Sequence, residues 1–164
     1  NPAFVARYRQ LGYENRQLRK EDFRNDAVDA GEVGSGQSVT ALYELELASA
    51  MKAPRRHSGV ATDVIATVRV RYRRIDTGAV EEIEHRVRQQ NVLPRFADAS
   101  PRFKLAAGVA EFSEILRGSP FAKGSTPEDV ANMIRPAALE LTLDHHVQEF
   151  LRLVQGASGM SRGR

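Results

Sequence analysis

Cysteine is absent from this chain of 164 residues, and no apolar run approaches the length that a membrane-spanning helix needs. The lack of cysteine excludes disulfide bonds, thiol catalysis and zinc held by cysteine, and it leaves the redox compartment open. No signal peptide is recognisable in the sequence. Because the first residue is Asn1 and a strand-like run follows almost at once, we expect the sequence to be a piece of a longer protein.

An excess of one charge is also missing, since 24 basic residues are nearly matched by 21 acidic ones and the net charge is +3. Nucleic-acid-binding domains usually gather basic residues in one patch, so this balance favours no nucleic-acid partner. Hydrophobic residues make up 41% of the chain and charged residues 27%, as in an average globular domain. A domain of this size buries about two thirds of its unfolded surface, which is enough to fold without a metal.

Four segments in the first half alternate apolar and polar residues, which is the period of a half-buried strand. They are residues 4–9, 38–49, 63–76 and 80–90. A tight turn at Gly78 separates the last two segments, which predicts a hairpin. The apolar residues of its first strand that we expect to face the core are Val64, Ala66, Val68, Val70 and Tyr72.

The second half of the chain has apolar residues at helical spacing. Helices are predicted over residues 98–119, 125–140 and 143–157, with N-caps at Ser100, Thr126 and Asp144. Gly118 and Gly156 are expected to end the first and third helices, and residues 158–164 to form a disordered tail.

Because strands come first and helices second, the sequence predicts an α+β fold. We expect an antiparallel β-sheet or small β-sandwich of about four to six strands, followed by about three C-terminal α-helices. Residues 1–157 are expected to form a single domain, with a β-rich part at 1–92 and a helical part at 98–157.

The stretch GEVGSGQS at residues 31–38 resembles a phosphate-binding loop, but Gln37 stands where that loop needs lysine. Such a loop also needs a helix directly after it, and here an alternating strand follows. Glu32 and the acidic residues before it have the wrong charge for binding phosphate. We therefore interpret the stretch as a turn that leads into a strand.

An acidic run surrounds the start of this stretch and comprises Glu21, Asp22, Asp26, Asp29 and Glu32. Calcium needs about six to eight oxygen ligands, and the spacing of an EF-hand loop is absent. We interpret the run as a solvated loop that serves as an interaction surface for a basic partner. A small-molecule hydrolase that uses the acidic loop 21–32 remains an alternative.

The four histidines are His57, His85, His145 and His146, and none of them has the i, i+4 spacing that chelates a metal on a helix. Ser35 lacks the strand–turn–helix setting of an activated nucleophile. Because no catalytic constellation is recognisable, we expect no enzyme activity, no cofactor and no metal site.

The arginines on the polar face of the predicted hairpin are Arg69, Arg71 and Arg73. Glu82 and Glu84 of the partner strand are expected to neutralise them through cross-strand pairs. A solvated sheet face without a nucleic-acid partner is therefore predicted. The remaining alternative is a basic nucleic-acid-binding module that also uses Arg55 and Arg56.

Three segments carry a more specific pattern, namely residues 7–47, 102–121 and 146–157. Their most specific runs are LGYENR, EDF and VDAGEVGSGQSVTALYE. In this order they resemble the region that follows the von Willebrand factor type A domain in YfbK-like bacterial proteins. The resemblance implies a family and no particular activity.

The resemblance also implies a location at the bacterial cell envelope, in a parent protein anchored as a lipoprotein. The D-x-S-x-S metal motif of the type A domain is absent here, so no metal ligand is carried over. The resemblance further implies that strands upstream of the type A domain complete the sheet. Without those strands, we expect the open sheet edges to pair into a homo-oligomer. We therefore expect a non-catalytic accessory domain that mediates protein–protein interaction or scaffolds the adjacent type A domain.

Overall fold

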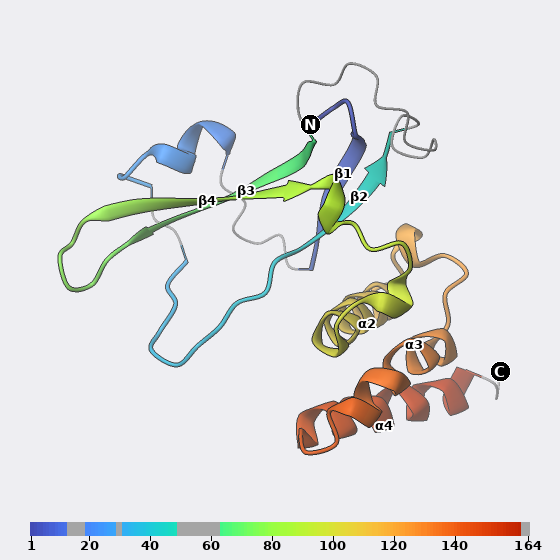
Figure 1. Cartoon of the computed structure of the whole chain (residues 1–164). Helices are drawn as coiled ribbons and strands as arrows, with labels where there is room; N and C mark the ends of the chain where they lie inside the picture. Colours follow the sequence, from blue (N-terminus) through green and yellow to red (C-terminus); the bar gives the residue numbers. More distant parts are fainter. Residues whose placement is uncertain (13–18, 29–30, 49–62, 162–164) are drawn as a thin grey trace. The chain divides into compact units, whose positions relative to one another are not determined.

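The computed structural model describes residues 1–12, 19–28, 31–48 and 63–161, and Figure 1 shows the course of the chain. These residues form two compact units, Asn1–Val92 and Leu93–Arg164. The first unit contains four strands in two antiparallel two-stranded sheets, with the orders β1–β2 and β3–β4. The second unit contains three α-helices. The predicted α+β fold, with antiparallel strands followed by three C-terminal helices, is thus confirmed.

Strands β1 (Val5–Leu11) and β2 (Leu42–Leu47) pair so that opposite charges face each other. Arg9 lies opposite Glu44, and their side chains form an ion pair of 2.5 Å. The polar stretch between the two strands contains one short helical turn, η1 (Lys20–Arg24), as the sequence indicates. The opposite face of this sheet carries Tyr8, Tyr43 and Leu45.

The predicted hairpin is confirmed and consists of β3 (Val64–Arg73) and β4 (Val80–Arg88). Gly78 lies in the connecting turn with a φ of +69°, which only glycine adopts easily. The register places Arg69 opposite Glu84, so the cross-strand charge pairing expected from the sequence is present.

The alternation of β3 is broken at Ile65. A strict period of two places Ile65 on the same face as the arginines, but the pairing register shifts between Val64 and Ala66. Such a β-bulge turns one side chain to a new direction. As a result Ile65 is only 1% exposed and belongs to the small core of this unit.

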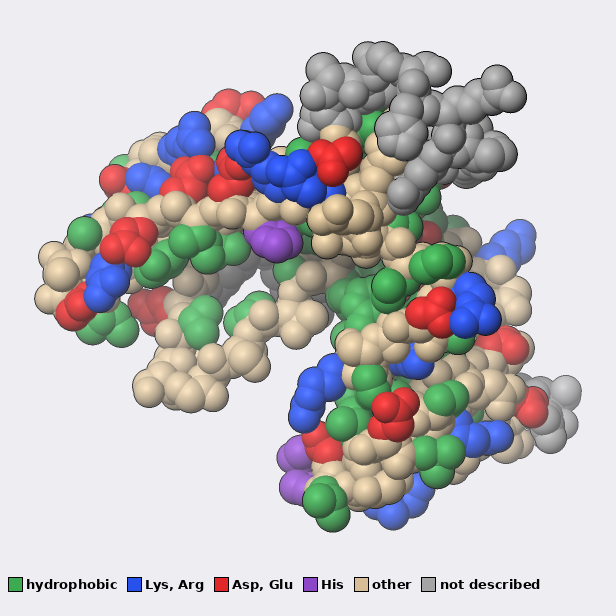
Figure 2. Space-filling view, in the orientation of Figure 1, with side chains coloured by type: hydrophobic (Ala, Val, Ile, Leu, Met, Phe, Trp, Pro, Cys, Tyr) green, Lys and Arg blue, Asp and Glu red, His purple; other side chains and the backbone are tan. Residues whose placement is uncertain are grey.

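The apolar face of the β3–β4 hairpin is exposed, and the prediction that it points into the core is wrong. Val68, Val70 and Tyr72 are 45%, 48% and 41% exposed, and Ile83 of β4 is 55% exposed. The reason is that a two-stranded sheet has two faces, and the described residues of the unit leave this one uncovered. Figure 2 shows hydrophobic side chains along one side of the hairpin and charged ones along the other.

The first unit has a very small core. Phe4 and Ile65 are the buried hydrophobic residues among its described residues. Asn1 joins the two sheets next to them, because its terminal nitrogen donates to the carbonyl of Ile65 at 2.9 Å and its side-chain amide donates to the carbonyl of Val64 at 2.8 Å. The start of β1 is therefore held at the start of β3.

The second unit packs three helices around a continuous core. They are α2 (Pro101–Leu116), α3 (Pro127–Glu140) and α4 (His145–Ser161). The buried residues of the core are Phe112, Val130, Ala131, Ile134 and Val154. Phe150 of α4 packs edge-on against Phe112, with 5.9 Å between the ring centroids.

The helix starts follow the sequence signals. The Ser100 hydroxyl accepts the amide of Phe103, and Thr126 and Asp129 form a reciprocal capping box. Asp144 precedes α4, and its backbone carbonyl, not its carboxylate, accepts the amide of Val147.

The end of α4 differs from the prediction. Gly156 does not end the helix, which continues to Ser161, so the predicted tail at 158–164 begins too early. A glycine inside a helix costs only about 1 kcal/mol, and the packing of Val154 on the core outweighs that cost.

A close approach between α2 and α3 occurs at Gly108. A Cβ atom at Gly108 would lie 2.2 Å from Cγ2 of Ile134, a distance far below van der Waals contact. Only a residue without a side chain allows the two helices to cross this closely. Gly108 therefore sets the spacing on which the core of the second unit depends.

Candidate functional site

The acidic residues predicted as an interaction loop are separated in the structure. Asp22 lies in η1 and pairs with Arg19 at 3.1 Å, within the same turn. Asp26 follows η1 and pairs with Arg71 of β3 at 2.7 Å. Glu21 is exposed, and no described residue forms an ion pair with it.

The remaining two acidic residues add no site. Glu32 is exposed and pairs with no described residue, and Asp29 lies outside the described residues. No group of three or more acidic, histidine or cysteine side chains in the described part of the chain could hold a metal ion. The structure thus does not bring the acidic run together as the hydrolase alternative requires.

The polar face of the β3–β4 hairpin instead holds η1 in place. Arg24 donates two parallel hydrogen bonds to Glu82, at 2.9 Å from Nε and 2.8 Å from Nη2. Two residues later, Asp26 pairs with Arg71. Arg71 and Glu82 are direct neighbours across the two strands. The segment around η1 therefore contributes an arginine to one ion pair and an aspartate to the other, and it matches both charges of the hairpin.

The same face is neutralised further along the strands, as the sequence predicts. Glu84 accepts hydrogen bonds from Arg69 across the strands and from Arg86 on its own strand. These two arginines lower the pKa of Glu84, with Arg86 as the larger cause. Arg55 and Arg56, which the nucleic-acid alternative needs, lie outside the described residues.

Hydrogen bonds on both faces of the hairpin also shift the pKa of other groups. Arg24 lowers the pKa of Glu82 mainly through its hydrogen bonds. A hydrogen bond of 2.6 Å to Glu81 raises the pKa of Tyr72, because the phenol is held in its protonated form. All of these groups are accessible to solvent. Their pKa shifts therefore reflect local pairing, and they do not indicate a buried catalytic acid or base.

The glycine-rich stretch at 31–38 is a turn, as predicted. The amide of Gln37 donates to the carbonyl of Gly34 at 3.1 Å, and the Gln37 side chain accepts the amide of Gly34 at 2.9 Å. Gly36 has a φ of +76° inside this turn. The backbone amide of Gly34, which a phosphate-binding loop would offer to phosphate, is therefore already bonded to Gln37, the residue in place of the lysine.

The histidines form no common site. His85 lies exposed on β4, and His57 is outside the described residues. His145 and His146 begin α4 with their ring centroids 4.0 Å apart. They belong to the second unit, and neither has a described third ligand nearby.

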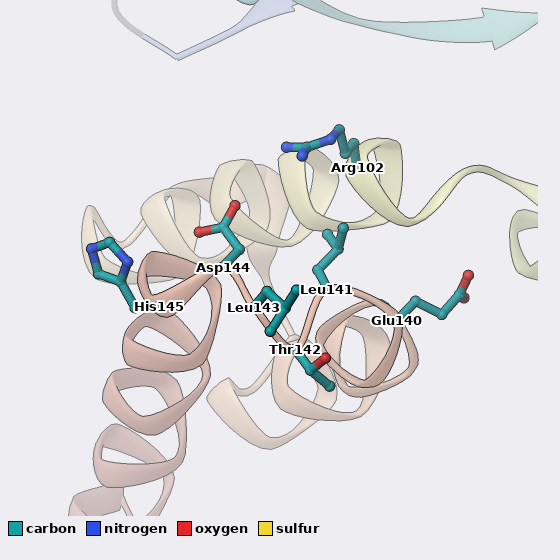
Figure 3. Close-up of a pocket in the computed structure, with 7 residues that line it drawn as sticks. All are labelled: Arg102, Glu140, Leu141, Thr142, Leu143, Asp144 and His145. Atoms are coloured by element: carbon teal, nitrogen blue, oxygen red, sulfur yellow. The ribbon is translucent and has the colours of Figure 1, made fainter.

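A shallow groove of about 500 Å³ lies at the junction of α3 and α4 (Figure 3). Its polar lining includes Arg102 of α2, Glu140 at the end of α3, and Asp144 and His145 before and at the start of α4. In Figure 3 the Glu140 side chain points away from Asp144 and His145. The groove therefore holds no convergent set of groups for catalysis.

Two exposed apolar sheet faces remain as the candidate site. The sequence pattern did not reveal them, because alternation of apolar and polar residues was interpreted as a strand with one face in the core. The hairpin face carries the exposed apolar side chains Val68, Val70, Tyr72 and Ile83, and His85 and Glu81 share this face in the register. The β1–β2 face consists of Tyr8, Tyr43 and Leu45, which are 73%, 51% and 38% exposed. Aromatic and branched side chains on an open face are typical of a protein-binding surface.

Comparison with known proteins identifies the family. Residues 1–160 match the family described as "Uncharacterized protein YfbK, C-terminal". Over 165 aligned residues the chain is 32% identical to the "Uncharacterized protein YfbK" of Escherichia coli strain K12. The chain belongs to the YfbK C-terminal family.

The match covers 98% of this chain and 28% of the Escherichia coli protein, so the chain spans less than a third of that relative. No solved structure matches the chain. None of the helices in the described residues is both long and apolar enough to cross a membrane.

Proposed function

We propose that this chain is a non-catalytic interaction domain whose first unit binds the preceding part of the longer polypeptide. The observation that carries the proposal is the contrast between the two units. Among the described residues of the first unit only Phe4 and Ile65 are buried hydrophobic residues, whereas the helical unit has a continuous core. An isolated two-stranded sheet is marginally stable in water, so the first unit gains stability by covering its apolar faces.

The hairpin face has the chemistry of a protein contact. Its four apolar side chains are each about half exposed, and full burial of such a side chain is worth about 1.5–3 kcal/mol. The opposite face is occupied by ion pairs within the chain, among them Arg69 with Glu84 at 2.8 Å. The apolar face is therefore the side that a partner covers.

The resemblance described above supports, as this partner, a von Willebrand factor type A domain in the same polypeptide at the bacterial envelope. In this proposal the domain orients that neighbour and performs no chemistry. The Escherichia coli relative supports a covalently linked partner, since the matched region is 28% of its length.

A binding experiment with matched variants tests the proposal. The preceding part of the natural polypeptide is supplied as a separate protein, and its binding to this chain is measured by calorimetry. We expect Val70→Glu and Ile83→Glu, on the exposed hairpin face, to weaken binding at least about tenfold, because each buries an unpaired charge.

The matched control is Thr67→Glu, which introduces the same charge opposite Arg86 on the other face of the hairpin. We expect this variant to bind as the unaltered chain does. Equal binding by all three variants, or the absence of binding to the preceding part, would contradict the proposal. Robust turnover of a hydrolase substrate that one acidic substitution abolishes would contradict its non-catalytic character.

A further inference from the structure

The outer edge of β3 carries an unusual contact at its beginning. The main-chain nitrogen of Asn1 donates to the carbonyl of Ile65 at 2.9 Å, beside the side-chain bond from Asn1 to Val64. In a polypeptide that continues before this residue, the same nitrogen is an ordinary amide. The contact then has the form of the first rung of a strand pairing on β3.

The direction of the backbone groups on β3 follows from its pairing with β4. Arg74 donates its amide to the carbonyl of Ala79, next to the turn. In an antiparallel pair the backbone groups of every second residue bond to the partner strand. The backbone N–H and C=O groups of the residues between them point to the outer edge. The residues of β3 whose backbone groups point to its outer edge are therefore Thr67, Arg69, Arg71 and Arg73.

These outward groups are open among the described residues. No backbone hydrogen bond from a described residue outside the hairpin reaches Thr67, Arg69 or Arg71. An edge of this length with alternating side chains is a template for a further strand. The chain start at Asn1 lies directly at its end.

We propose that the segment preceding Asn1 in the longer polypeptide adds a third, antiparallel strand to the outer edge of β3. An antiparallel course carries the upstream residues from Ile65 toward Arg73, along the whole open edge. A parallel course would leave β3 almost at once, because Val64 is its first residue. The antiparallel course therefore pairs far more backbone groups.

The added strand also extends both faces of the hairpin. Its alternate side chains lie beside Val68 and Val70 on the apolar face and beside Arg69 and Arg71 on the charged face. The expected partner is thus an extended segment with apolar residues at every second position. This inference rests on the proposed function and adds to it the element that is bound and its register.

Amide hydrogen exchange, measured by NMR, tests the strand directly. Exchange rates are compared between this chain and a longer polypeptide that includes the natural residues before Asn1. We expect the amides of Thr67, Arg69 and Arg71 to exchange at least about tenfold more slowly in the longer polypeptide. The outward amide of Arg86 on β4 is expected to keep its rate.

Proline variants provide a second test that spares the hairpin. Thr67→Pro removes an outward amide of β3, and Arg86→Pro removes an outward amide at the opposite edge on β4. In the longer polypeptide we expect Thr67→Pro to restore fast exchange at Arg69 and Arg71, and Arg86→Pro to leave these amides protected.

The other outcomes overturn either the added strand or the proposed function. Unchanged exchange in the longer polypeptide excludes the strand, and protection at Arg86 instead places it on β4. Protection of Thr67 in this chain alone that rises with concentration assigns the edge to a second copy. If the outer edge of β3 stays unprotected while Val70→Glu still weakens binding, the result supports the proposed function and contradicts the added strand. If the edge is protected and Val70→Glu has no effect, the apolar docking falls.

Discussion

Arg24 and Glu82 are 58 residues apart in sequence and form a two-pronged ion pair, with hydrogen bonds of 2.9 and 2.8 Å. The pair fastens η1 to the polar face of the β3–β4 hairpin. Parallel bonds from one guanidinium to one carboxylate fix both the distance and the orientation of the two elements. The acidic segment around η1 is therefore part of the folded hairpin face.

The ion pair predicts a dependence of η1 docking on pH. The pKa of Glu82 lies below its ordinary value of 4.5, chiefly because of Arg24. A lowered folded-state pKa stabilises the docked state above the unfolded pKa, and this stabilisation is lost as the pH falls through the folded pKa. We expect NMR signals of η1 to shift on acidification below about pH 4.5.

Two arginine variants separate this effect from general acid sensitivity. Arg24→Gln is expected to raise the pKa of Glu82 toward its ordinary value and to release η1 at neutral pH. Arg19→Gln removes only the local pair with Asp22 and is expected to leave the titration of Glu82 unchanged. The carboxyl signal of Glu82 measured by NMR against pH reports both results.

The close helix crossing predicts an unusual effect of glycine substitution. Gly108→Ala would gain about 1 kcal/mol of helix propensity but places its methyl group 2.2 Å from Ile134. Overpacking of this kind costs about 1–3 kcal/mol, so we expect net destabilisation in denaturant unfolding.

Gly156→Ala is the matched control, because the new Cβ would meet no atom within 4 Å beyond its chain neighbours and the backbone of its own helix. This variant is expected to stabilise α4 by about 0.5–1 kcal/mol. Stabilisation by both variants would show that the α2–α3 crossing is looser than described.

A buried carboxylate forms polar contacts at the C-terminal end of α2. Glu114 is 4% exposed, pairs with Arg117 and accepts a hydrogen bond of 2.6 Å from the Ser119 hydroxyl. Glu114→Gln keeps the shape but removes the charge that both partners bind, so we expect a loss of about 1–3 kcal/mol in unfolding free energy. Glu111→Gln, three residues earlier on the same helix, should change it by less than about 0.5 kcal/mol.

The end of α3 depends on a side chain from α4. Gln148 donates its amide to the carbonyl of Ala138 at 2.8 Å, which satisfies a group that the helix end leaves open. Gln148→Met should cost about 0.5–1.5 kcal/mol in thermal or denaturant unfolding. Gln155→Met on the exposed side of α4 is the control, and a similar loss there would assign the effect to helix propensity.

Local signals in the sequence predicted much of the fold. The alternation of β3 and β4 and the glycine between them are sufficient for the hairpin, and Ser100 and Thr126 mark two helix starts. The charge pairing of Arg69 with Glu84 also follows from the register alone. These features are determined by residues that are neighbours along the chain or across a single turn.

Long-range packing decided the rest. The bulge that buries Ile65 contacts Asn1, 64 residues away in sequence, and the period of the strand does not predict this contact. Alternation predicts which side chains share a face but not whether a second layer covers that face, so Val68 and Val70 were assigned to the core. Similarly, Gly156 stays helical because of tertiary contacts around Val154.

The scarcity of buried side chains among the described residues of the first unit has a consequence for proteolysis. A segment with so little interior opens often, and each opening exposes backbone to proteases. Proteolysis of this chain should therefore begin before Leu93 and leave a resistant helical fragment.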